Sequence, residues 1–421
     1  MPTLAEKIFS KHCIEGEAKA GNFIRAKLDL VMGEDVTIPL ALNKFNELGF
    51  TEVFAKDKVI FVLDHLLPTN NVDSAQTHKK IRKFAKKHEI KYLYDQHNMG
   101  IEHALLPEQG HIYPGQLVIG ADSHTCTYGA LGAFSTGIGS TDMAVGMGTG
   151  ELWFKVPETI KFNYNGKLPK WVSGKDLILY TIGDIGADGA TYKAMEFDGE
   201  VIKKLPMADR FTMSNMAIEA GGKAGLIEVD ETTLQYLKGK VEREYEIYKS
   251  DEDANFEKVI NYNVSNLEPQ VAFPYSPENT KSISEINKRI KIDEAIIGSC
   301  TNGRLEDLRR AAKVLKGKKV NEEVRLIIIP ATRNIYKEAM KEGLLEIFMD
   351  AGAGVSMPTC GPCFGGHTGV LGPGEKAITS TNRNFKGRLG SPDSKAFLAN
   401  PSVVAASAIA GEIIHPEEVV S

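Results

Sequence analysis

Short apolar runs alternate along the chain with segments of helical periodicity. Four runs rich in branched aliphatic residues cover 58–63, 116–120, 295–298 and 324–329. Each is four to six residues long and ends in polar residues, which predicts a short buried strand. Because strands that alternate with helices form mostly parallel sheets, the pattern predicts an α/β fold.

Polar residues capable of chemistry follow three of these four predicted strands. The segments after the four strands are Asp64-His65, Asp122-Ser123-His124, Ser299-Cys300 and Pro330-Ala331-Thr332-Arg333. In open α/β sheets, ligands bind just beyond the carboxyl ends of the strands. We therefore expect the first three segments to contribute acid–base groups or metal ligands to a site.

The length of 421 residues exceeds what one ordinary core supports, so several domains are expected. We predict two intertwined α/β subdomains in residues 1–280 and a further α/β subdomain in residues 281–421. The polar stretch 249–261 and the proline-bearing stretch 269–277 are interpreted as the crossing between them. The glycine-dense segment 129–150 contains no phosphate-binding motif and predicts close backbone packing near a site.

Composition narrows the class of protein. Hydrophobic residues make up 42% of the chain, charged residues 25%, and the net charge is −5, which gives no electrostatic reason to expect a nucleic-acid partner. The lysine run at 79–87 is interpreted as the solvated face of a helix. No apolar stretch approaches the ~18–20 residues needed to span a bilayer, so no membrane partner is expected. Few cysteines and no signal-peptide pattern favour a reducing cytoplasm.

Three of the five cysteines have distinctive settings. Cys300 lies in Gly-Ser-Cys-Thr-Asn, and Cys360 and Cys363 form Cys-Gly-Pro-Cys. Three thiolates can hold a metal centre and leave one position open for a substrate oxygen. From the cysteines alone, a zinc site completed by a histidine and a thioredoxin-like redox pair remain open as well. Cys13 and Cys126 are interpreted as ordinary buried thiols.

Two sequence motifs place a carboxylate beside an imidazole, namely Asp64-His65 and Asp122-Ser123-His124. A carboxylate fixes the tautomer of a histidine and raises its basicity, so these pairs are candidate proton donors or acceptors, although such pairs also occur as structural contacts. His103, in Gly-Ile-Glu-His-Ala, is a third candidate.

Two arginines, Arg383 and Arg388, lie in Asn-Arg-Asn-Phe-Lys-Gly-Arg, which begins at Asn382. Arginine binds carboxylates through two parallel hydrogen bonds, so the pair suits a di- or tricarboxylate substrate. The alternative is that both arginines form surface salt bridges.

Together these motifs resemble those of the aconitase superfamily. The segments that carry the resemblance appear in the family's order and span nearly the whole chain from Thr3 onward: Phe-Val-Leu-Asp-His-Leu, Gly-Ala-Asp-Ser-His-Thr, Ile-Gly-Ser-Cys-Thr-Asn, Cys-Gly-Pro-Cys and Thr-Asn-Arg-Asn-Phe-Lys-Gly-Arg. Within the superfamily, the chain resembles the large subunits of the isopropylmalate isomerase, homoaconitase and citramalate isomerase group. The resemblance implies an iron–sulfur catalytic core of three α/β subdomains with mostly parallel sheets.

The resemblance implies one [4Fe–4S] cluster, with Cys300, Cys360 and Cys363 as ligands and one open iron for the substrate hydroxyl and carboxylate. His65, oriented by Asp64, is expected near the leaving hydroxyl.

Further roles follow from the same resemblance. Asp122 and His124 are expected around the iron-bound water, and His103 is expected to pair with a carboxylate, which we assign to Glu196 in Ala-Met-Glu-Phe. The expected substrate-binding residues are Ser123, Asn382, Arg383 and Arg388. Asp35 matches an early family motif, whereas Glu34 stands where aconitase has a glutamine.

One family element is missing from the sequence. Aconitase continues into a swivel domain that carries a catalytic serine in a Gly-Ser-Ser-Arg-like motif, and this chain has no such motif. The resemblance therefore implies a separate small subunit that supplies this serine. The implied reaction is that of a hydro-lyase, which isomerises a 2-hydroxy di- or tricarboxylic acid by dehydration and rehydration. The expected substrate is 2-isopropylmalate, converted to 3-isopropylmalate in leucine biosynthesis, with homocitrate, citramalate and dimethylmalate as alternatives.

Two other classes of function compete with this reading. Some aconitase relatives bind RNA when the cluster is lost, but the acidic balance and the absence of a basic stripe argue against an RNA-binding protein. A zinc-structured redox protein that uses Cys360 and Cys363 as a dithiol is the other alternative.

Overall fold

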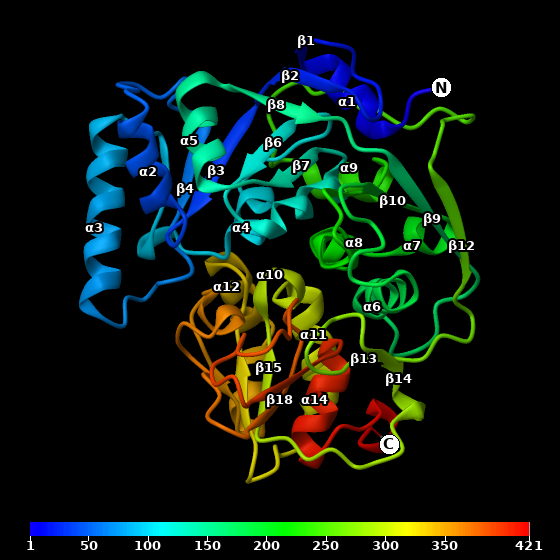
Figure 1. Ribbon diagram of the computed structural model, residues 1–421. Coiled ribbons are helices and arrows are strands. Elements are labelled where there is room, and N and C mark those ends of the chain that lie inside the picture. The colour runs from blue at the N-terminus through cyan, green and yellow to red at the C-terminus, as the bar shows by residue number, and fades with distance from the viewer. Residues whose placement is uncertain (421) are drawn as a thin grey trace. The chain divides into compact units, whose positions relative to one another are not determined.

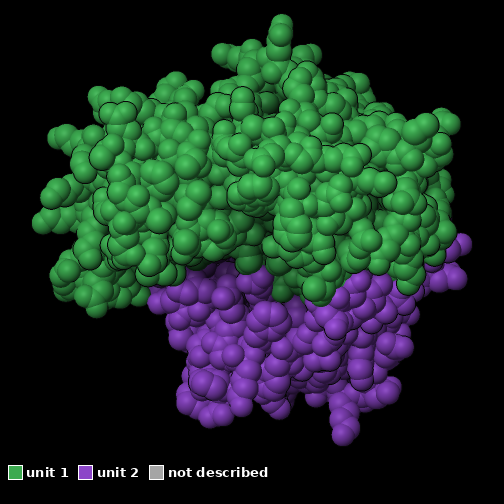
Figure 2. All heavy atoms as spheres, turned by 45° about the horizontal axis from the view of Figure 1, so that its top comes forward, with its two compact units in different colours: residues 1–98, 105–165, 190–262 green, residues 99–104, 166–189, 263–421 purple. Residues whose placement is uncertain are grey.

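The computed structural model describes residues 1–420 (Figure 1). The chain divides into two compact units, which Figure 2 shows in different colours. Unit 1 comprises residues 1–98, 105–165 and 190–262, and unit 2 comprises residues 99–104, 166–189 and 263–421. The last change of unit, at 262–263, lies between the two stretches interpreted as a crossing. The predicted division at residue 280, with two intertwined subdomains before it, stays a prediction.

Unit 1 is built around a five-stranded parallel sheet with the order β5-β4-β3-β6-β7. Its strands are β3 (Leu30–Glu34), β4 (Val59–Val62), β5 (Tyr92–Tyr94), β6 (Leu117–Gly120) and β7 (Phe134–Gly137). The strands predicted at 58–63 and 116–120 are therefore confirmed, as β4 and β6.

Alternate residues of these strands pack against helices on the two faces of the sheet. Val31, Phe61 and Ile119 share a buried cluster with side chains of α2 (Ile38–Glu47), α3 (Val72–Lys87) and α5 (Ser140–Thr149). Met32 and Val62 share another with α4 (Glu102–Glu108), the 3-10 helix η2 (Ser123–Leu131) and α8 (Met207–Asn215). Burial on both faces explains why these strands are continuously apolar.

Two smaller sheets complete unit 1. An antiparallel sheet has the order β1-β2-β8, and a second has the order β11-β10-β9-β12, in which β10 pairs in parallel with β9 and β11. The remaining elements of unit 1 are α1 (Leu4–His12), β1 (Cys13–Glu15), β2 (Phe23–Lys27), η1 (Gln96–Asn98), β8 (Glu151–Lys155), β9 (Thr159–Asn165), β10 (Ala194–Asp198), α7 (Glu200–Lys204), η3 (Met216–Ala220), β11 (Ala224–Leu226), α9 (Glu231–Leu237) and β12 (Lys258–Asn263).

Unit 2 contains a seven-stranded sheet with the order β14-β13-β19-β18-β15-β16-β17. The five strands from β19 to β17 are parallel, and β13 and β14 are antiparallel additions. The strands are β13 (Gln270–Ala272), β14 (Thr280–Ser282), β15 (Glu294–Ile297), β16 (Arg325–Ile328), β17 (Gly354–Val355), β18 (Lys376–Thr379) and β19 (Lys395–Leu398). The strands predicted at 295–298 and 324–329 are confirmed as β15 and β16.

One face of this sheet packs against helices, with Ile297, Leu326 and Ile378 in a buried cluster with α11 (Leu305–Leu315), α13 (Leu344–Ala351) and α14 (Pro401–Ala410). The other face presents Ile296 to a cluster that contains all three cysteines of interest. The remaining elements of unit 2 are α6 (Gly174–Ile185), η4 (Ile283–Glu285), α10 (Ser299–Asn302), α12 (Arg333–Lys341), η5 (Gly361–Phe364) and η6 (Pro416–Glu418).

The lysines of α3 behave as predicted. Those at 79, 80, 83, 86 and 87 are exposed, while Ile81, Phe84 and Ala85 are buried on the opposite side of the helix. Across residues 1–420, none of the helices combines the length and the apolar character that a membrane span requires.

Close backbone packing is confirmed within the glycine-dense segment. A Cβ atom added to Gly129 would lie 2.0 Å from the carbonyl oxygen of Gly225, on β11. Gly129 belongs to η2, the turn that directly follows Asp122 and carries Ser123 and His124. Glycine at this position lets η2 approach β11, at the edge of the β11-β10-β9-β12 sheet.

We expect Gly129→Ala to destabilise the protein by about 1–3 kcal/mol, because the added methyl group meets backbone rather than a movable side chain. Urea unfolding measures the change. Gly354→Ala is the matched control, since the nearest atom to an added Cβ there is 3.8 Å away. Equal stability of the Gly129 and Gly354 variants would contradict the packing argument.

Candidate active site

In unit 1, three adjacent parallel strands bring acidic and histidine residues to the same edge of the sheet. Glu34 ends β3 and precedes Asp35, while Asp64-His65 follows β4 and Asp122-Ser123-His124 follows β6. The sequence-predicted carboxylate–imidazole motifs therefore lie on neighbouring strands of one sheet.

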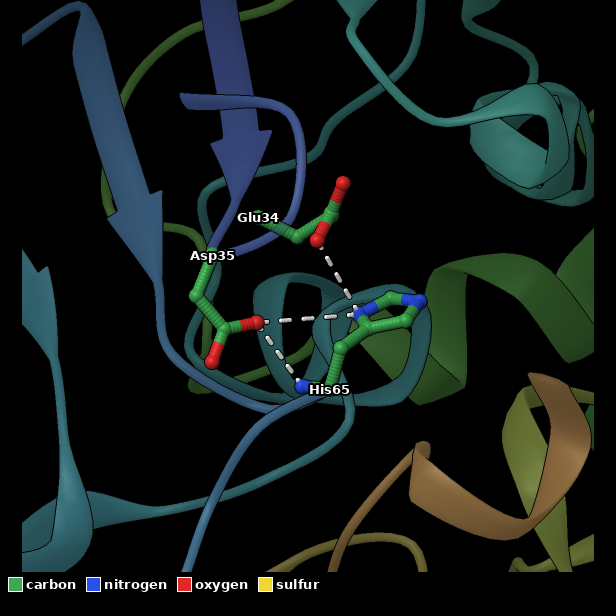
Figure 3. A group of neighbouring side chains, drawn as sticks. All are labelled: Glu34, Asp35 and His65. Atoms are coloured by element: carbon green, nitrogen blue, oxygen red, sulfur yellow. Dashed lines mark hydrogen bonds and ion pairs between the residues drawn. The ribbon is translucent and has the colours of Figure 1, made fainter. Parts of the chain in front are cut away.

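His65 is surrounded by carboxylates. Its Nδ1 lies 2.7 Å from Asp64 Oδ1, 3.4 Å from Glu34 Oε2 and 4.0 Å from Asp35 Oδ1. Figure 3 shows Glu34 and Asp35 extending from the end of β3 toward the imidazole. Asp64 is therefore placed to hold Nδ1 protonated, as the sequence predicts for this pair.

Opposing effects set the charge of this group. Burial lowers the pKa of His65, but the negative charges of Glu34 and Asp64 outweigh burial and raise that pKa well above its usual range. Burial raises the pKa of Glu34 to about 7, although the charge on His65 opposes that rise. The raised pKa favours the imidazolium form of His65, which can donate a proton. Ligand atoms of Glu34, Asp35 and His65 lie within 4.8 Å of one another, but an imidazolium there opposes binding of a metal cation.

Asp35 is a structural anchor of this group. Its fully buried carboxylate accepts hydrogen bonds from the backbone amides of His65 (2.9 Å) and Leu66 (3.0 Å), and from His78 Nε2 at 2.6 Å. Burial acts to raise the pKa of Asp35, but the His78 hydrogen bond and the charge on His65 more than offset it and keep that pKa low. An ionised Asp35 thus fixes the backbone that carries His65.

His124 has a carboxylate partner that the sequence analysis did not identify. Its Nε2 lies 2.9 Å from Oε1 of Glu219, which is buried in η3. Its Nδ1 lies 3.5 Å from Asp122 Oδ1 and 3.5 Å from the hydroxyl of Ser123, and its backbone amide donates to Asp122 Oδ1 at 2.7 Å. The only signal for Glu219 in the sequence is a lone charged residue within the small and apolar run Met-Ala-Ile-Glu-Ala-Gly-Gly.

Glu196 and His103 each have a polar neighbour in their own unit. Glu196, on β10, accepts a hydrogen bond from the Ser250 hydroxyl at 2.7 Å and lies 3.7 Å from Lys161 Nζ. Burial raises the pKa of this carboxyl to about 7. His103 belongs to unit 2, where its Nε2 lies 3.2 Å from Glu102 Oε1. The pairing of His103 with Glu196 stays a prediction.

In unit 2, the three cysteines come from the ends of parallel strands. Cys300 lies in α10, which follows β15. Cys360 is the N-cap of η5, Cys363 lies within η5, and this element follows β17. All three are buried in one cluster with Ile101, Ala104, Ile296, Ile329 and Ala331. The structure thus brings together three thiols that are up to 63 residues apart in the sequence.

Asn382 joins two of these thiols. The Cys363 thiol donates to Asn382 Oδ1 over 3.0 Å, and Asn382 Nδ2 donates to Cys300 Sγ over 3.3 Å. Asn382 follows β18, the strand that pairs with β15, and is fully buried. Asn382 therefore belongs structurally to the cysteine cluster.

The two predicted carboxylate-binding arginines follow Asn382. The Arg388 side chain is half-buried, and among the described residues its buried Nε has no hydrogen-bond partner. The guanidinium of Arg383 lies 5.9 Å from the ring centre of Phe385. Asn384 anchors the loop through hydrogen bonds to the carbonyl oxygens of Phe273 (2.7 Å) and Ala396 (3.3 Å). A buried guanidinium nitrogen without a partner among the described residues suits an anionic ligand.

The donor set of unit 2 fits an iron–sulfur cluster. Thiolates are the ligands that such clusters take, and here three of them share a buried, largely aliphatic environment that limits access of water. Asn382, an uncharged amide, forms hydrogen bonds with two of the three sulfur atoms, those of Cys363 and Cys300.

Comparison with known proteins identifies the family. A model of the aconitase family (aconitate hydratase) matches residues 6–289 and 284–411. The chain belongs to the aconitase family. Enzymes of this family carry a [4Fe–4S] cluster.

Relatives within the family are similar over their full length. The chain is 60% identical over 417 residues to the 3-isopropylmalate dehydratase large subunit of Halothermothrix orenii, and 59% identical over 419 residues to 3-isopropylmalate dehydratase large subunit 1 of Pyrococcus furiosus. In both comparisons, 99% of each chain is covered. The predicted membership of the superfamily is confirmed, as is the resemblance to this group of large subunits.

The fold agrees with a solved structure of the family. Aconitase X of Thermococcus kodakaraensis, in its holo form, matches with a TM-score of 0.51 and 14% identity over 85% of this chain and 84% of that chain. Together with the parallel strand pairs of both units, this likeness confirms the predicted aconitase-like α/β fold.

We expect Glu34→Gln to lower the pKa of His65. The Glu34 charge is the largest influence that raises this pKa, so its loss leaves the lowering effect of burial less opposed. Titration of the ¹³C-labelled imidazole by NMR measures the shift. Glu47→Gln, at an exposed position of α2, should leave the titration unchanged. An unchanged or higher pKa of His65 in Glu34→Gln would contradict the electrostatic account.

Proposed function

We propose that this chain is the large subunit of a 3-isopropylmalate dehydratase, a hydro-lyase that interconverts 2-isopropylmalate and 3-isopropylmalate by dehydration and rehydration. The observation that carries the proposal is the buried cluster of three cysteines with Asn382, in a chain 60% identical to such a large subunit over 99% of both lengths. The implied pathway is leucine biosynthesis, in the cytoplasm.

Cys300, Cys360 and Cys363 would hold the [4Fe–4S] cluster. With three thiolates as its protein ligands, the bound cluster would supply one open, Lewis-acidic iron to the hydroxyl that leaves. The buried aliphatic residues around the thiols would exclude water from the cofactor. Asn382 would orient Cys300, because its Nδ2 can still donate to that sulfur atom as a thiolate.

His65 would act as the general acid of the dehydration. The raised pKa of His65 favours a proton on the imidazole, and Asp64 holds Nδ1, so Nε2 would be the atom that delivers the proton. Rehydration would return the proton to the same atom. Such a positioned acid typically contributes ~10²–10⁴-fold to the rate.

Asp122 and His124 would orient the water that is lost and regained, with Glu219 fixing the His124 ring through Nε2. Ser123, between them in the sequence, would bind the substrate. His103 is a further candidate acid–base residue, and Glu196 stays in the proposal only as its expected partner. Arg383 and Arg388, with Asn382 beside them, would bind the substrate carboxylates by charge-assisted hydrogen bonds.

A small subunit would supply the base. Removal of a proton next to a carboxylate needs a positioned base, and we propose a serine on a separate small chain, in keeping with the "large subunit" names of the relatives. Homocitrate, citramalate and dimethylmalate are the alternative substrates.

The chain by itself should show negligible turnover, because the base is absent, and addition of its small subunit should raise the activity at least a hundredfold. The assay compares 2-isopropylmalate with homocitrate, citramalate and dimethylmalate. Full activity of the chain alone would overturn the two-subunit proposal, and a preference for another acid would overturn the proposed substrate.

Serine substitutions test the ligand set. Cys300→Ser, Cys360→Ser and Cys363→Ser should each abolish a stable cluster, measured as iron and sulfide per chain after anaerobic reconstitution. Cys126→Ser, at a buried thiol in unit 1, is the matched control and should keep the wild-type iron content. Stoichiometric zinc with no iron in the wild type would favour the zinc alternative instead.

A further inference from the structure

Two buried cations, Lys175 and Arg304, bind backbone carbonyl groups of the segments that carry the cysteine cluster. Lys175 has no exposed surface and Arg304 is 7% exposed. Charged side chains are rarely buried so completely, because removing them from water is costly unless their hydrogen bonds are satisfied. The backbone carbonyl groups that satisfy these two side chains therefore show which segments the side chains hold in place.

Lys175 binds the segment between β18 and Asn382. Its Nζ donates to the carbonyl oxygens of Ser380 at 3.0 Å and of Thr381 at 2.5 Å. The Ser380 carbonyl also accepts from the Thr301 hydroxyl at 2.8 Å, and the Ser380 hydroxyl accepts from the amide of Gly298 at 3.0 Å. The lysine thus holds a segment that is bonded on both sides of Cys300 and leads directly into Asn382.

The position of Lys175 is itself fixed by its neighbour. Asp176 caps the start of α6 by accepting from the amide of Ser173 at 2.7 Å, and it also accepts from the amide of Gln270 at 2.9 Å and from Asn400 Nδ2 at 2.9 Å. A cation in the first turn of a helix opposes the helix dipole. The stability of α6 therefore does not explain why a lysine is buried at position 175. The hydrogen bonds of its Nζ to the two carbonyl oxygens do explain it.

Arg304 also binds backbone carbonyl groups, in this case those of the Cys300 turn and of His103. Its Nη1 donates to the carbonyl oxygens of Cys300 at 2.7 Å and Thr301 at 3.2 Å, and its Nη2 donates to that of His103 at 3.2 Å. The segments 99–104 and 166–189 are both excursions of the chain from unit 1 into unit 2. Arg304 links the first of these segments to the turn of Cys300, and Lys175 links the second to the Ser380–Thr381 backbone.

We propose that Lys175 is a positioning residue, which holds the Ser380–Thr381 backbone so that Asn382 and Cys300 keep the geometry needed to bind the cluster. Arg304 holds the turn of Cys300 and Thr301 through their carbonyl oxygens. The proposal rests on the proposed function, because it assigns the cluster to these thiols. Lys175 acts through Asn382 and the Cys300 turn and does not contact substrate or cofactor.

The test uses the full-length chain, reconstituted anaerobically with iron and sulfide. Lys175→Met keeps an unbranched side chain one heavy atom shorter than lysine, and it removes the charge and the hydrogen-bond donors. Lys316→Met, at an exposed lysine of unit 2, is the matched control. The cluster of Lys175→Met should decay at least about tenfold faster in air than that of the wild type, and the EPR signal of its oxidised three-iron form should shift or broaden.

A merely structural role would lower the melting temperature and leave the decay rate and the EPR signal, both measured well below that temperature, unchanged. That result would overturn the proposal. If Lys175→Met does not fold, Thr301→Val takes its place, because it removes the neighbouring hydrogen bond to the Ser380 carbonyl. Thr301→Val should also speed the decay of the cluster in air and shift or broaden the EPR signal. A wild-type decay rate and a wild-type EPR signal in this variant would contradict the proposal. A wild-type chain that assembles no cluster would instead contradict the proposed function.

Discussion

The hydrogen bonds of Asn382 to the thiols of Cys300 and Cys363 are the interaction on which the cysteine cluster depends. They require β15 and β18 to be neighbours, because the two strands deliver Cys300 and Asn382 to the same edge of the sheet. They also require a sharp turn after β15, where Gly298 has φ 153° and Ser299 has φ 76°. A left-handed conformation at a serine is unfavourable, and its presence beside Cys300 marks a turn held in place by its surroundings.

In unit 1, the equivalent constraint is the crowding of carboxylates around one imidazole. The pKa values of two adjacent residues, Glu34 and Asp35, are shifted in opposite directions. Burial raises the pKa of Glu34 to about 7. Burial also acts to raise the pKa of Asp35, but the His78 hydrogen bond and the His65 charge overcome it and lower that pKa. Asp35 is therefore the fixed anion that anchors the backbone, and Glu34 responds to the charge of His65. Carboxyl groups separated in this way commonly mark acid–base sites.

Much of this arrangement could be predicted from the sequence, because strands and the residues that follow them are encoded locally. The four apolar runs became β4, β6, β15 and β16. Asp64-His65, Asp122-Ser123-His124 and Ser299-Cys300 follow three of these strands, at the carboxyl ends where ligands bind in open α/β sheets. The exposed lysine face of α3 follows from helical periodicity in the same way.

Contacts between distant segments could not be predicted in this way. Glu219 lies 95 residues from His124, and Lys175 lies about 205 residues from the carbonyls that it binds, so nothing local relates them. Glu196, in Ala-Met-Glu-Phe, is assigned to His103 by the family resemblance alone. A charged residue in an apolar strand indicates a buried carboxylate but not its partner, and Ser250 lies beside Glu196 in the fold.

The central claim is that three thiols hold a cluster whose remaining iron is open to substrate. Mössbauer spectroscopy of the chain reconstituted with ⁵⁷Fe, together with its small subunit, tests this claim most directly. On addition of 2-isopropylmalate, the account predicts that one iron of the four changes its spectrum while the other three, bound to Cys300, Cys360 and Cys363, do not. Four iron sites that are all unaffected by substrate would contradict it.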